Sequence, residues 1–330
     1  YSVLKFVNYM THNNINNRKI QDIERYESKK VRSEEFRDLV KSLVSDSYYW
    51  LIEECGTFLS FVGDKELNKI KMHRGNFCKH RFCPMCAWRK ARKDALELSL
   101  MMQDIKISYD KAFIFLTLTT PNVVAERLGD EIKRYNKSFD KLFKRKVVKR
   151  VVKGYVRKLE ITYNEKRDDY HPHFHVLIVV NKSYFTDVKA YLNQKEWLRL
   201  WREATGISEI TQVDVRRVKE QNSNELYEMA KYTGKDSDYL SNEKVFKVFY
   251  ESLKGKRAFA YGGLFKEVRK KLKNGDLDYL KEVDPTKYIY QIFCGWNQMH
   301  YYASELRLMS EEMQKEVNHQ MINELDDKYL

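Results

Sequence analysis

The fold is decided by two neighbouring stretches, Gly154–Tyr163 (GYVRKLEITY) and His173–Val180 (HFHVLIVV). The first alternates polar and apolar residues with the period of two that is typical of a β-strand, and the second is rich in apolar and β-branched residues. A polar loop, 164–170, lies between them. Together they predict a β-hairpin with a fairly long loop.

Further strands and helices are expected on both sides of this hairpin. The patterns predict strands at 112–119 and 212–218, and helices at 123–149, 183–203 and 224–232. The order is strand, helix, strand, strand, helix, strand, helix. It predicts an α+β fold, in which helices pack mainly on one face of a central antiparallel sheet of the ferredoxin or RRM-like type.

The flanking regions have other patterns. Short strands are expected around Cys55, including Trp50–Ile52, and a helix is expected from Ala87 to about Met102. The end of the chain is expected to be mostly helical, with one strand at 288–293. The chain is therefore divided into a polar N-terminal extension (1–46), a cysteine-containing module with a basic helix (47–110), the α+β domain (111–240) and a mostly helical C-terminal region (241–330).

A His-Phe-His sequence, with His173 and His175, begins the second strand of the hairpin. Because side chains alternate along a strand, both imidazoles point to one face, where they can bind one divalent metal ion. Glu160 on the neighbouring strand is the expected third ligand, and His171 is the alternative. The pair alone is also explained by two ordinary histidines, but three of the chain's eight His fall within five positions here.

A segment further along, 227–235 (YEMAKYTGK), carries Glu228, Tyr232 and Lys235. Glu228 and Tyr232 are four residues apart and therefore share a helix face. A tyrosine can attack phosphorus, a carboxylate can act as a base, and a lysine can stabilise phosphate charge. By spacing alone, however, an amphipathic helix with tyrosines on one face explains this segment better.

The cysteines predict a metal site in the module before the sheet. Cys83 and Cys86 have the spacing of a metal knuckle, and Cys78 lies five residues earlier. A tetrahedral Zn²⁺ site needs a fourth ligand, for which Cys55 and His80 compete. Such a site is structural, because four protein ligands leave no open position for a substrate. The fifth cysteine stands far from these and is expected to be a core thiol.

The charge of the chain favours a polyanionic partner. Its 330 residues include 61 Lys and Arg against 47 Asp and Glu, which gives a net charge of +14. Nucleic acid is the usual partner of such a chain, and a solvated surface is the simpler alternative. Basic residues that are candidates for contacts with the DNA backbone lie in the helix after the knuckle (Arg89, Lys90, Arg92, Lys93) and in a later run (Lys144, Arg145, Lys149, Arg150).

No apolar run reaches the ~18–20 residues that span a bilayer, and no secretory signal is visible where the sequence begins. We therefore expect no membrane partner and a cytoplasmic location. In that compartment cysteines are metal ligands or free thiols rather than disulfides.

Three motifs, in order along the chain, resemble those of the replication initiators of small rolling-circle plasmids of Gram-positive bacteria. These initiators are single-tyrosine members of the HUH endonuclease superfamily. The motifs are Phe115–Thr119 (FLTLT), His171–Leu177 (HPHFHVL) and Tyr232–Lys235 (YTGK), with Glu228 upstream. The likeness also covers 78–91 and 261–271, so it spans most of residues 50–300. Each motif is weak by itself, but the ordered set is specific.

The resemblance implies a metal-dependent DNA nickase and strand transferase that initiates plasmid copying, with residues 111–240 as the HUH nicking domain. Mg²⁺ or Mn²⁺ bound by His173, His175 and a carboxylate, placed at Glu160, polarises the scissile phosphate. Tyr232 attacks the phosphorus and stays joined to the 5′ end as a covalent phosphotyrosine. The freed 3′ hydroxyl is then extended by the host polymerase.

The resemblance also implies roles for other residues and partners. Glu228 activates the water of the terminating cleavage, and Lys235 orients the tyrosine or stabilises phosphate charge. Cys55 is favoured over His80 as the fourth zinc ligand, because the family carries Cys-Gly at this position. The expected partners are the plasmid double-strand origin, single-stranded or hairpin at the nick, a host helicase and polymerase, and a second copy if the chain oligomerises. The terminal regions, 1–110 and 241–330, are expected to help select the origin.

Three other interpretations are open at this stage. A single-strand transposase of the same superfamily would use the same active site. A zinc-containing, non-catalytic DNA-binding repressor would explain the charge and the cysteines, but not the ordered motifs. A nuclease that uses activated water would still cleave DNA after replacement of Tyr232 by Phe.

Overall fold

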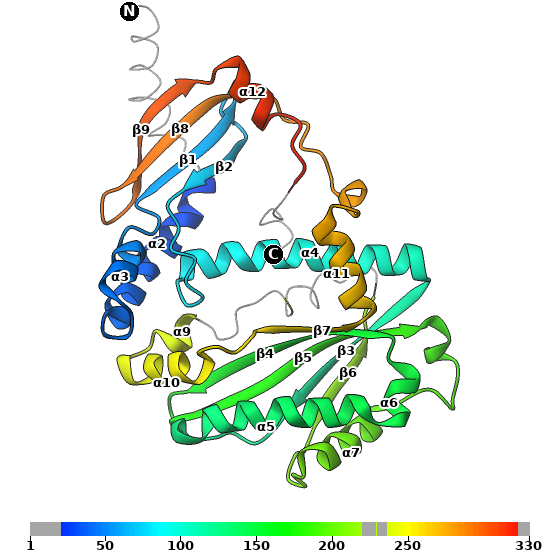
Figure 1. Cartoon of the computed structure of the whole chain (residues 1–330). Helices are drawn as coiled ribbons and strands as arrows, with labels where there is room; N and C mark the ends of the chain where they lie inside the picture. The colour runs from blue at the N-terminus through cyan, green and yellow to red at the C-terminus, as the bar shows by residue number, and fades with distance from the viewer. Residues whose placement is uncertain (1–20, 220–228, 230–235, 323–330) are drawn as a thin grey trace, which may run out of the picture. The chain divides into compact units, whose positions relative to one another are not determined.

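The computed structural model describes residues 21–219, 229 and 236–322 (Figure 1). The described residues form two compact units, one within 1–90 and 282–323 and the other within 91–281. The boundaries of these units differ from those expected at residues 46, 110 and 240, because the first unit joins the beginning of the chain to residues 282–323. The helix expected at 224–232 lies outside the described residues, apart from residue 229.

The second unit is built on a five-stranded antiparallel sheet with the strand order β6-β3-β5-β4-β7. The predicted hairpin is confirmed, because β4 (Gly154–Asn164) pairs with β5 (Asp169–Asn181) over its full length. The other strands are β3 (Lys111–Thr119), β6 (Val213–Arg217) and β7 (Phe259–Gly263). The expected α+β fold with a central antiparallel sheet is therefore confirmed.

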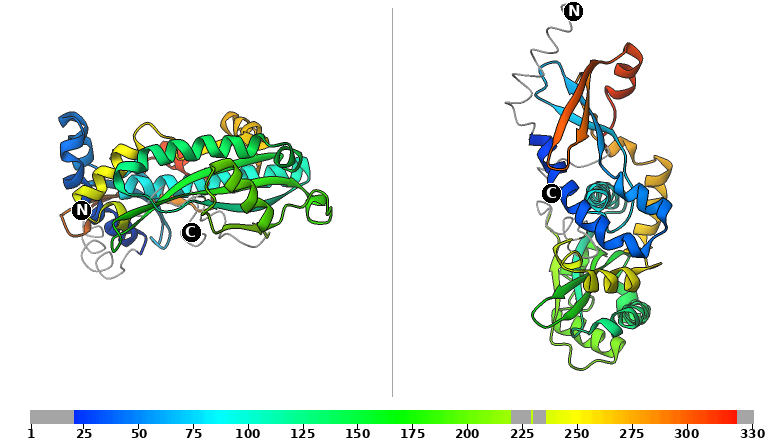
Figure 2. Two further views of the ribbon diagram at one scale, coloured as in Figure 1. Left: turned by 90° about the horizontal axis from the view of Figure 1, so that it is seen from below. Right: turned by 90° about the vertical axis from the view of Figure 1, so that its left-hand side faces the viewer.

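Helices cover both faces of this sheet, so the expectation that they pack mainly on one face was wrong (Figures 1 and 2). α5 and α7 pack on one face, where Tyr135 contacts the rings of Phe174 and Trp201. On the other face, α4 and α11 bury apolar side chains against β3, β4 and β5 in one cluster. No described helix is long and apolar enough to cross a membrane. The helical elements of this part of the chain are α4 (Pro84–Tyr109), α5 (Ala125–Lys144), α6 (Lys146–Val151), η2 (Lys182–Phe185), α7 (Gln194–Thr205), α9 (Asp236–Tyr239), α10 (Glu243–Leu253), α11 (Leu264–Asn274) and η3 (Asp278–Leu280).

The first unit contains a four-stranded antiparallel sheet with the order β2-β1-β8-β9. Its strands come from distant parts of the sequence, since β1 and β2 lie near the beginning and β8 and β9 near the end. Tyr26 of α2 packs edge-on against Phe61 of β1, with ring centroids 5.5 Å apart. The elements are α2 (Gln21–Val40), η1 (Lys41–Leu43), α3 (Asp46–Glu53), β1 (Phe58–Asp64), β2 (Ile70–Gly75), β8 (Tyr288–Trp296), β9 (Tyr301–Leu308) and α12 (Glu311–Val317).

Several details differ from the sequence predictions. Trp50–Ile52 belongs to the helix α3, in which only Ile52 is buried, so the apolar run marks a short amphipathic helix rather than a strand. The helix predicted at 183–203 begins later, at α7, because Asn193 and Glu196 form a capping box there. The described part of the C-terminal region has helices but also three strands, of which β7 pairs with β4, β8 pairs with β1, and β9 pairs with β8.

Candidate active site and metal centres

The β4–β5 hairpin brings the predicted metal ligands together. In its register Glu160 lies directly opposite His173, and His175 follows two residues later on the same face. This is the face that α4 and α11 partly cover, since Leu177 and Val179, next in the same row, belong to their apolar cluster. The three polar side chains therefore continue the row of core residues beyond the end of that cluster.

The three side chains converge closely enough to bind one ion. The Oε2 atom of Glu160 lies 3.0 Å from Nε2 of His175 and 3.7 Å from Nε2 of His173. Their donor atoms all lie within 4.8 Å of one another. All three residues are buried, with at most 9% of their surface exposed. One carboxylate and two imidazoles suit a divalent cation and leave coordination positions open for substrate oxygens.

Charge and hydrogen bonding favour the protonation states in which these three side chains bind a cation. Burial alone would raise the pKa of Glu160, but hydrogen bonds from His173 and His175 hold it well below its usual range. Burial lowers the pKa of His175, which favours the neutral imidazole that binds metals. Lys158, fully buried and opposite His175 in the register, adds a positive charge that lowers both pKa values. Lys158 was not among the site residues predicted from the sequence.

His171, the alternative third ligand, lies one step further along the hairpin. It pairs with Thr162 in the register and stacks on His173, with ring centroids 5.3 Å apart. Among the described residues, the group whose donor atoms converge contains Glu160 and not His171. The geometry therefore favours Glu160 as the third ligand.

The nucleophile segment is only partly described. Tyr232, Glu228 and Lys235 all lie outside the described residues. Met229, which follows Glu228 directly, is completely buried in the apolar cluster that α4 and α11 form on the metal-ligand face of the sheet. The chain therefore reaches this face of the sheet three residues before Tyr232.

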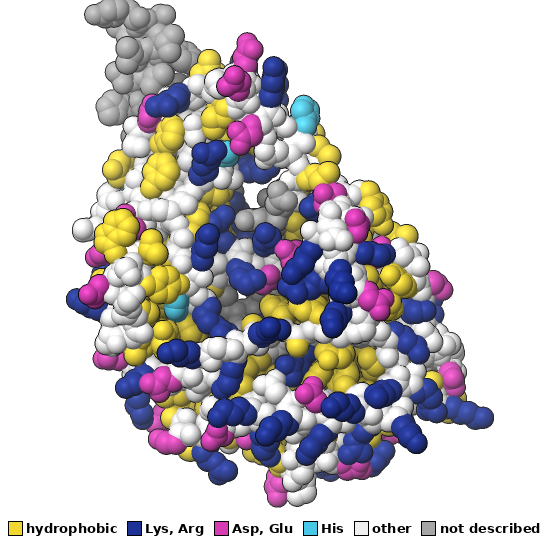
Figure 3. All heavy atoms as spheres, viewed as in Figure 1, with side chains coloured by type: hydrophobic (Ala, Val, Ile, Leu, Met, Phe, Trp, Pro, Cys, Tyr) yellow, Lys and Arg dark blue, Asp and Glu magenta, His cyan; other side chains and the backbone are white. Residues whose placement is uncertain are grey.

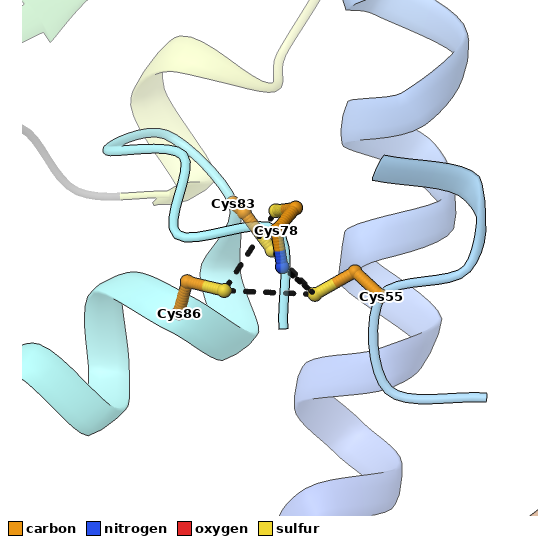
Figure 4. A group of neighbouring side chains, drawn as sticks. All are labelled: Cys55, Cys78, Cys83 and Cys86. Atoms are coloured by element: carbon orange, nitrogen blue, oxygen red, sulfur yellow. Dashed lines mark hydrogen bonds between the residues drawn. The ribbon is translucent and has the colours of Figure 1, made fainter. Parts of the chain in front are cut away.

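The four cysteines of the module also converge (Figure 4). The Sγ atom of Cys55 lies 3.7 Å from that of Cys83 and 3.5 Å from that of Cys86, and Cys78 lies 3.7 Å from Cys86. A tetrahedron with Zn–S bonds of ~2.3 Å has edges of about 3.8 Å, so the separations fit Zn²⁺. They are far too long for disulfides, whose sulfurs lie about 2.05 Å apart.

Hydrogen-bond donors surround the sulfurs of this cluster. The backbone N–H of Lys79 donates to Cys86 Sγ, and that of Cys78 donates to Cys55 Sγ. Hydrogen bonds with the other three cysteines lower the pKa of Cys83, whereas the pKa values of Cys55, Cys78 and Cys86 are raised, with burial among the causes. Ser33 of α2 lies 3.5 Å from the same sulfur, so the N-terminal extension, for which the sequence indicated no chemistry, lies against the cluster.

His80, the competing zinc ligand, is held elsewhere. Its Nδ1 accepts a hydrogen bond from the N–H of Phe82, and its ring packs 4.9 Å from that of Phe36. Burial lowers its pKa to about 4. Within the described part of the chain, the converging group contains the four thiols and no imidazole.

This geometry predicts different results for two substitutions. His80→Ala is expected to keep one zinc ion per chain and to lower the free energy of unfolding by about 1–3 kcal/mol, through lost packing. Cys55→Ser is expected to lose the zinc, because one corner of the tetrahedron disappears. Metal analysis of the purified variants measures both. Zinc lost from His80→Ala but kept by Cys55→Ser would contradict the four-cysteine assignment.

The two predicted groups of DNA-contacting basic residues differ in position. On α4, Arg92 is buried and Arg89 packs on the ring of Phe77 at 3.8 Å, whereas Lys90 and Lys93 are exposed. These two lysines therefore remain the candidates for contacts with DNA from this helix.

The second basic group lies at the end of α5 and in α6, in the helix layer that covers the face opposite the metal ligands. Arg145 pairs with Glu203 at 2.5 Å, and Arg150 donates to the carbonyl of Lys189. Lys144 and Lys149 are exposed, and Lys and Arg are also numerous on the face of this unit in Figure 3. A DNA contact by this group stays a prediction, and it would lie away from the metal ligands.

Comparison with known proteins identifies the family to which a chain with this sheet and these metal ligands belongs. The family described as Replication protein matches residues 69–302, which include both candidate metal centres except for Cys55. The chain belongs to the Replication protein family, and the resemblance to rolling-circle initiators is thereby confirmed. No solved structure matches the chain.

Individual relatives carry corresponding names. A "Protein rep" of Staphylococcus aureus is 64% identical over 222 residues, which cover 67% of this chain and 97% of the relative. A "Protein rep" of Bacillus amyloliquefaciens is 40% identical, over 69% of this chain and 74% of its own length. Another, from Streptococcus pneumoniae, is 36% identical over 78% of this chain and 84% of the relative.

Proposed function

We propose that this chain initiates rolling-circle replication by nicking one strand of a plasmid double-strand origin. The observation that carries the proposal is the convergence of Glu160, His173 and His175 on one sheet face, in a member of the Replication protein family. When bound there, Mg²⁺ or Mn²⁺ supplies Lewis-acid polarisation of the scissile phosphate. The site's open coordination positions and its buried ligands are the features that support this use.

In this proposal Tyr232 is the nucleophile. Its phenolic oxygen bonds to phosphorus and gives up its proton, while the bond to the 3′ oxygen breaks and leaves a 3′ hydroxyl. The protein stays joined to the 5′ phosphate, and host polymerase extends the free end with the help of a helicase. The support is positional, because Met229 is buried on the metal-ligand face three residues before Tyr232.

The remaining residues complete the proposed reaction. Glu228 acts as the base for the water that ends the cycle, and Lys235 stabilises charge on the phosphate. Zn²⁺ on the four cysteines holds the first unit together and takes no part in the chemistry. Lys90 and Lys93, on the helix that begins in the zinc cluster, contact the DNA backbone.

The proposal is tested on a supercoiled plasmid that carries the chain's own origin. Incubation with Mn²⁺ is expected to yield open circles nicked at one position, and a chelator or a scrambled origin is expected to prevent nicking. Binding of the origin without any nicking would support the repressor instead. Nicking at many positions, independent of the origin, would contradict the role in initiation.

A further inference from the structure

Both imidazoles of the ligand group have an oxygen partner at the nitrogen that does not face Glu160. Nδ1 of His175 lies 3.3 Å from Oγ1 of Thr117, and Nδ1 of His173 lies 3.2 Å from the carbonyl oxygen of His171. The Nε2 atoms of both rings face the carboxylate. The two histidines thus have the same arrangement, although their partners come from different elements.

When an ion occupies the site, Nε2 binds it instead of donating to Glu160, and the hydrogen of each neutral ring lies on Nδ1. A neutral imidazole that binds a metal through Nε2 must carry its hydrogen on Nδ1, and that N–H needs an acceptor. A backbone carbonyl can only accept, so the carbonyl of His171 selects this tautomer for His173. For His175, the hydroxyl oxygen of Thr117 lies at Nδ1 and can accept in the same way.

The sheet itself holds the Thr117 hydroxyl in place. Thr117 lies on β3 directly opposite His175, so the two side chains share a face. A β-branched side chain on a strand has few χ1 rotamers, so its hydroxyl has little freedom to turn away. Phe115, two residues earlier on the same face, packs on the His175 ring with centroids 5.5 Å apart. The imidazole is thus fixed by β3 on one side and by Glu160 of β4 on the other.

We infer that Thr117 is a positioning residue for the catalytic metal centre. Its hydroxyl accepts the Nδ1 hydrogen of His175 and so presents Nε2 to the ion. The inference rests on the proposed function, in which His175 is a metal ligand. Thr117 is the central threonine of the FLTLT motif, and this inference gives that threonine a chemical role.

Thr117→Val, which keeps the shape of the side chain and removes the hydroxyl, tests the inference in the zinc-loaded, full-length protein. Titration with Mn²⁺, followed by the electron paramagnetic resonance of the free ion, is expected to show binding weakened roughly 10- to 100-fold. Thr117→Ser is expected to restore most of the affinity. The matched control is Thr119→Val, because Thr119 lies opposite His173 on the same strand but donates to the carbonyl of Gln212 at 3.0 Å. That control is expected to bind like the wild type.

A second readout needs no DNA. In the Mg²⁺-saturated protein, where Nε2 binds the ion and Nδ1 carries the hydrogen, the ¹⁵N chemical shift of Nδ1 of His175 is expected to show a hydrogen-bonded N–H in the wild type and to move in Thr117→Val, where that N–H has lost its acceptor. Unchanged Mn²⁺ affinity with an unchanged Nδ1 chemical shift would overturn the inference, and so would an equal loss of affinity in Thr119→Val. If Glu160→Gln binds Mn²⁺ no more weakly than the wild type does, the proposed metal centre is contradicted. The inference about Thr117 is then contradicted with it.

Discussion

Glu160→Gln is expected to lower the rate of metal-dependent origin nicking by about 1000-fold or more. The substitution keeps the size of the side chain and removes the charge that lies 3.0 Å from His175 and 3.7 Å from His173. A metal ion contributes several kcal/mol to the stabilisation of transition-state charge, and about 4 kcal/mol corresponds to a factor of about 1000 in rate. Single-turnover nicking of an origin oligonucleotide at fixed Mn²⁺ concentration measures the effect.

The matched control for this substitution is Glu165→Gln. Glu165 lies in the loop of the same hairpin, between β4 and β5, and is exposed. Its replacement is expected to leave nicking unchanged. Equal rates for Glu160→Gln and the wild type would mean that this carboxylate has no part in the reaction, and would remove the main support for the proposed metal centre.

Removal of zinc is expected to unfold the first unit. Structural Zn²⁺ sites contribute on the order of 10 kcal/mol to folding, which is as much as the whole stability of a typical domain. Cys83→Ser should have the same effect as a chelator, because Cys83 is completely buried and lies in contact with Cys55 and Ser33. Thermal denaturation of the zinc-loaded, chelated and Cys83→Ser proteins measures the loss.

Cys294→Ser provides the control for the zinc experiment. Cys294 is as buried as Cys83 but lies on β8, outside the converging group of thiols. Its replacement is expected to cost only about 1–3 kcal/mol and to keep the zinc. A first unit that melts at the same temperature with and without zinc would contradict a structural role for the metal.

The sequence predicted the centre of this architecture because local patterns determine it. The period of two in β4 and β5 places Glu160, His173 and His175 on one face, and a hairpin joins neighbouring strands without any long-range choice. Cys83 and Cys86 are likewise only three residues apart, so a single turn of the chain brings their sulfurs together. In both cases the side chains that converge are close in sequence or lie on adjacent strands.

Contacts between distant segments were not predictable in this way. The pairing of β1 with β8 joins residues more than 200 positions apart, and no periodicity in either strand names its partner. The same holds for Thr117, whose contact with His175 depends on the register between β3 and β5. The prediction of a strand at Trp50–Ile52 was wrong for a different reason, because a three-residue apolar run fits a helix turn as well as a strand.

A covalent bond between Tyr232 and DNA distinguishes the proposed nickase from a nuclease that uses activated water. The protein is incubated with Mn²⁺ and a single-stranded oligonucleotide from the nick region of its own plasmid, labelled on the 3′ side of the nick, and is analysed on a denaturing gel. A labelled protein band is expected, and it should disappear with a chelator and in Tyr232→Phe. Cleavage without a labelled band, or with equal rates in Tyr232→Phe, would contradict the covalent step and indicate a nuclease that uses activated water.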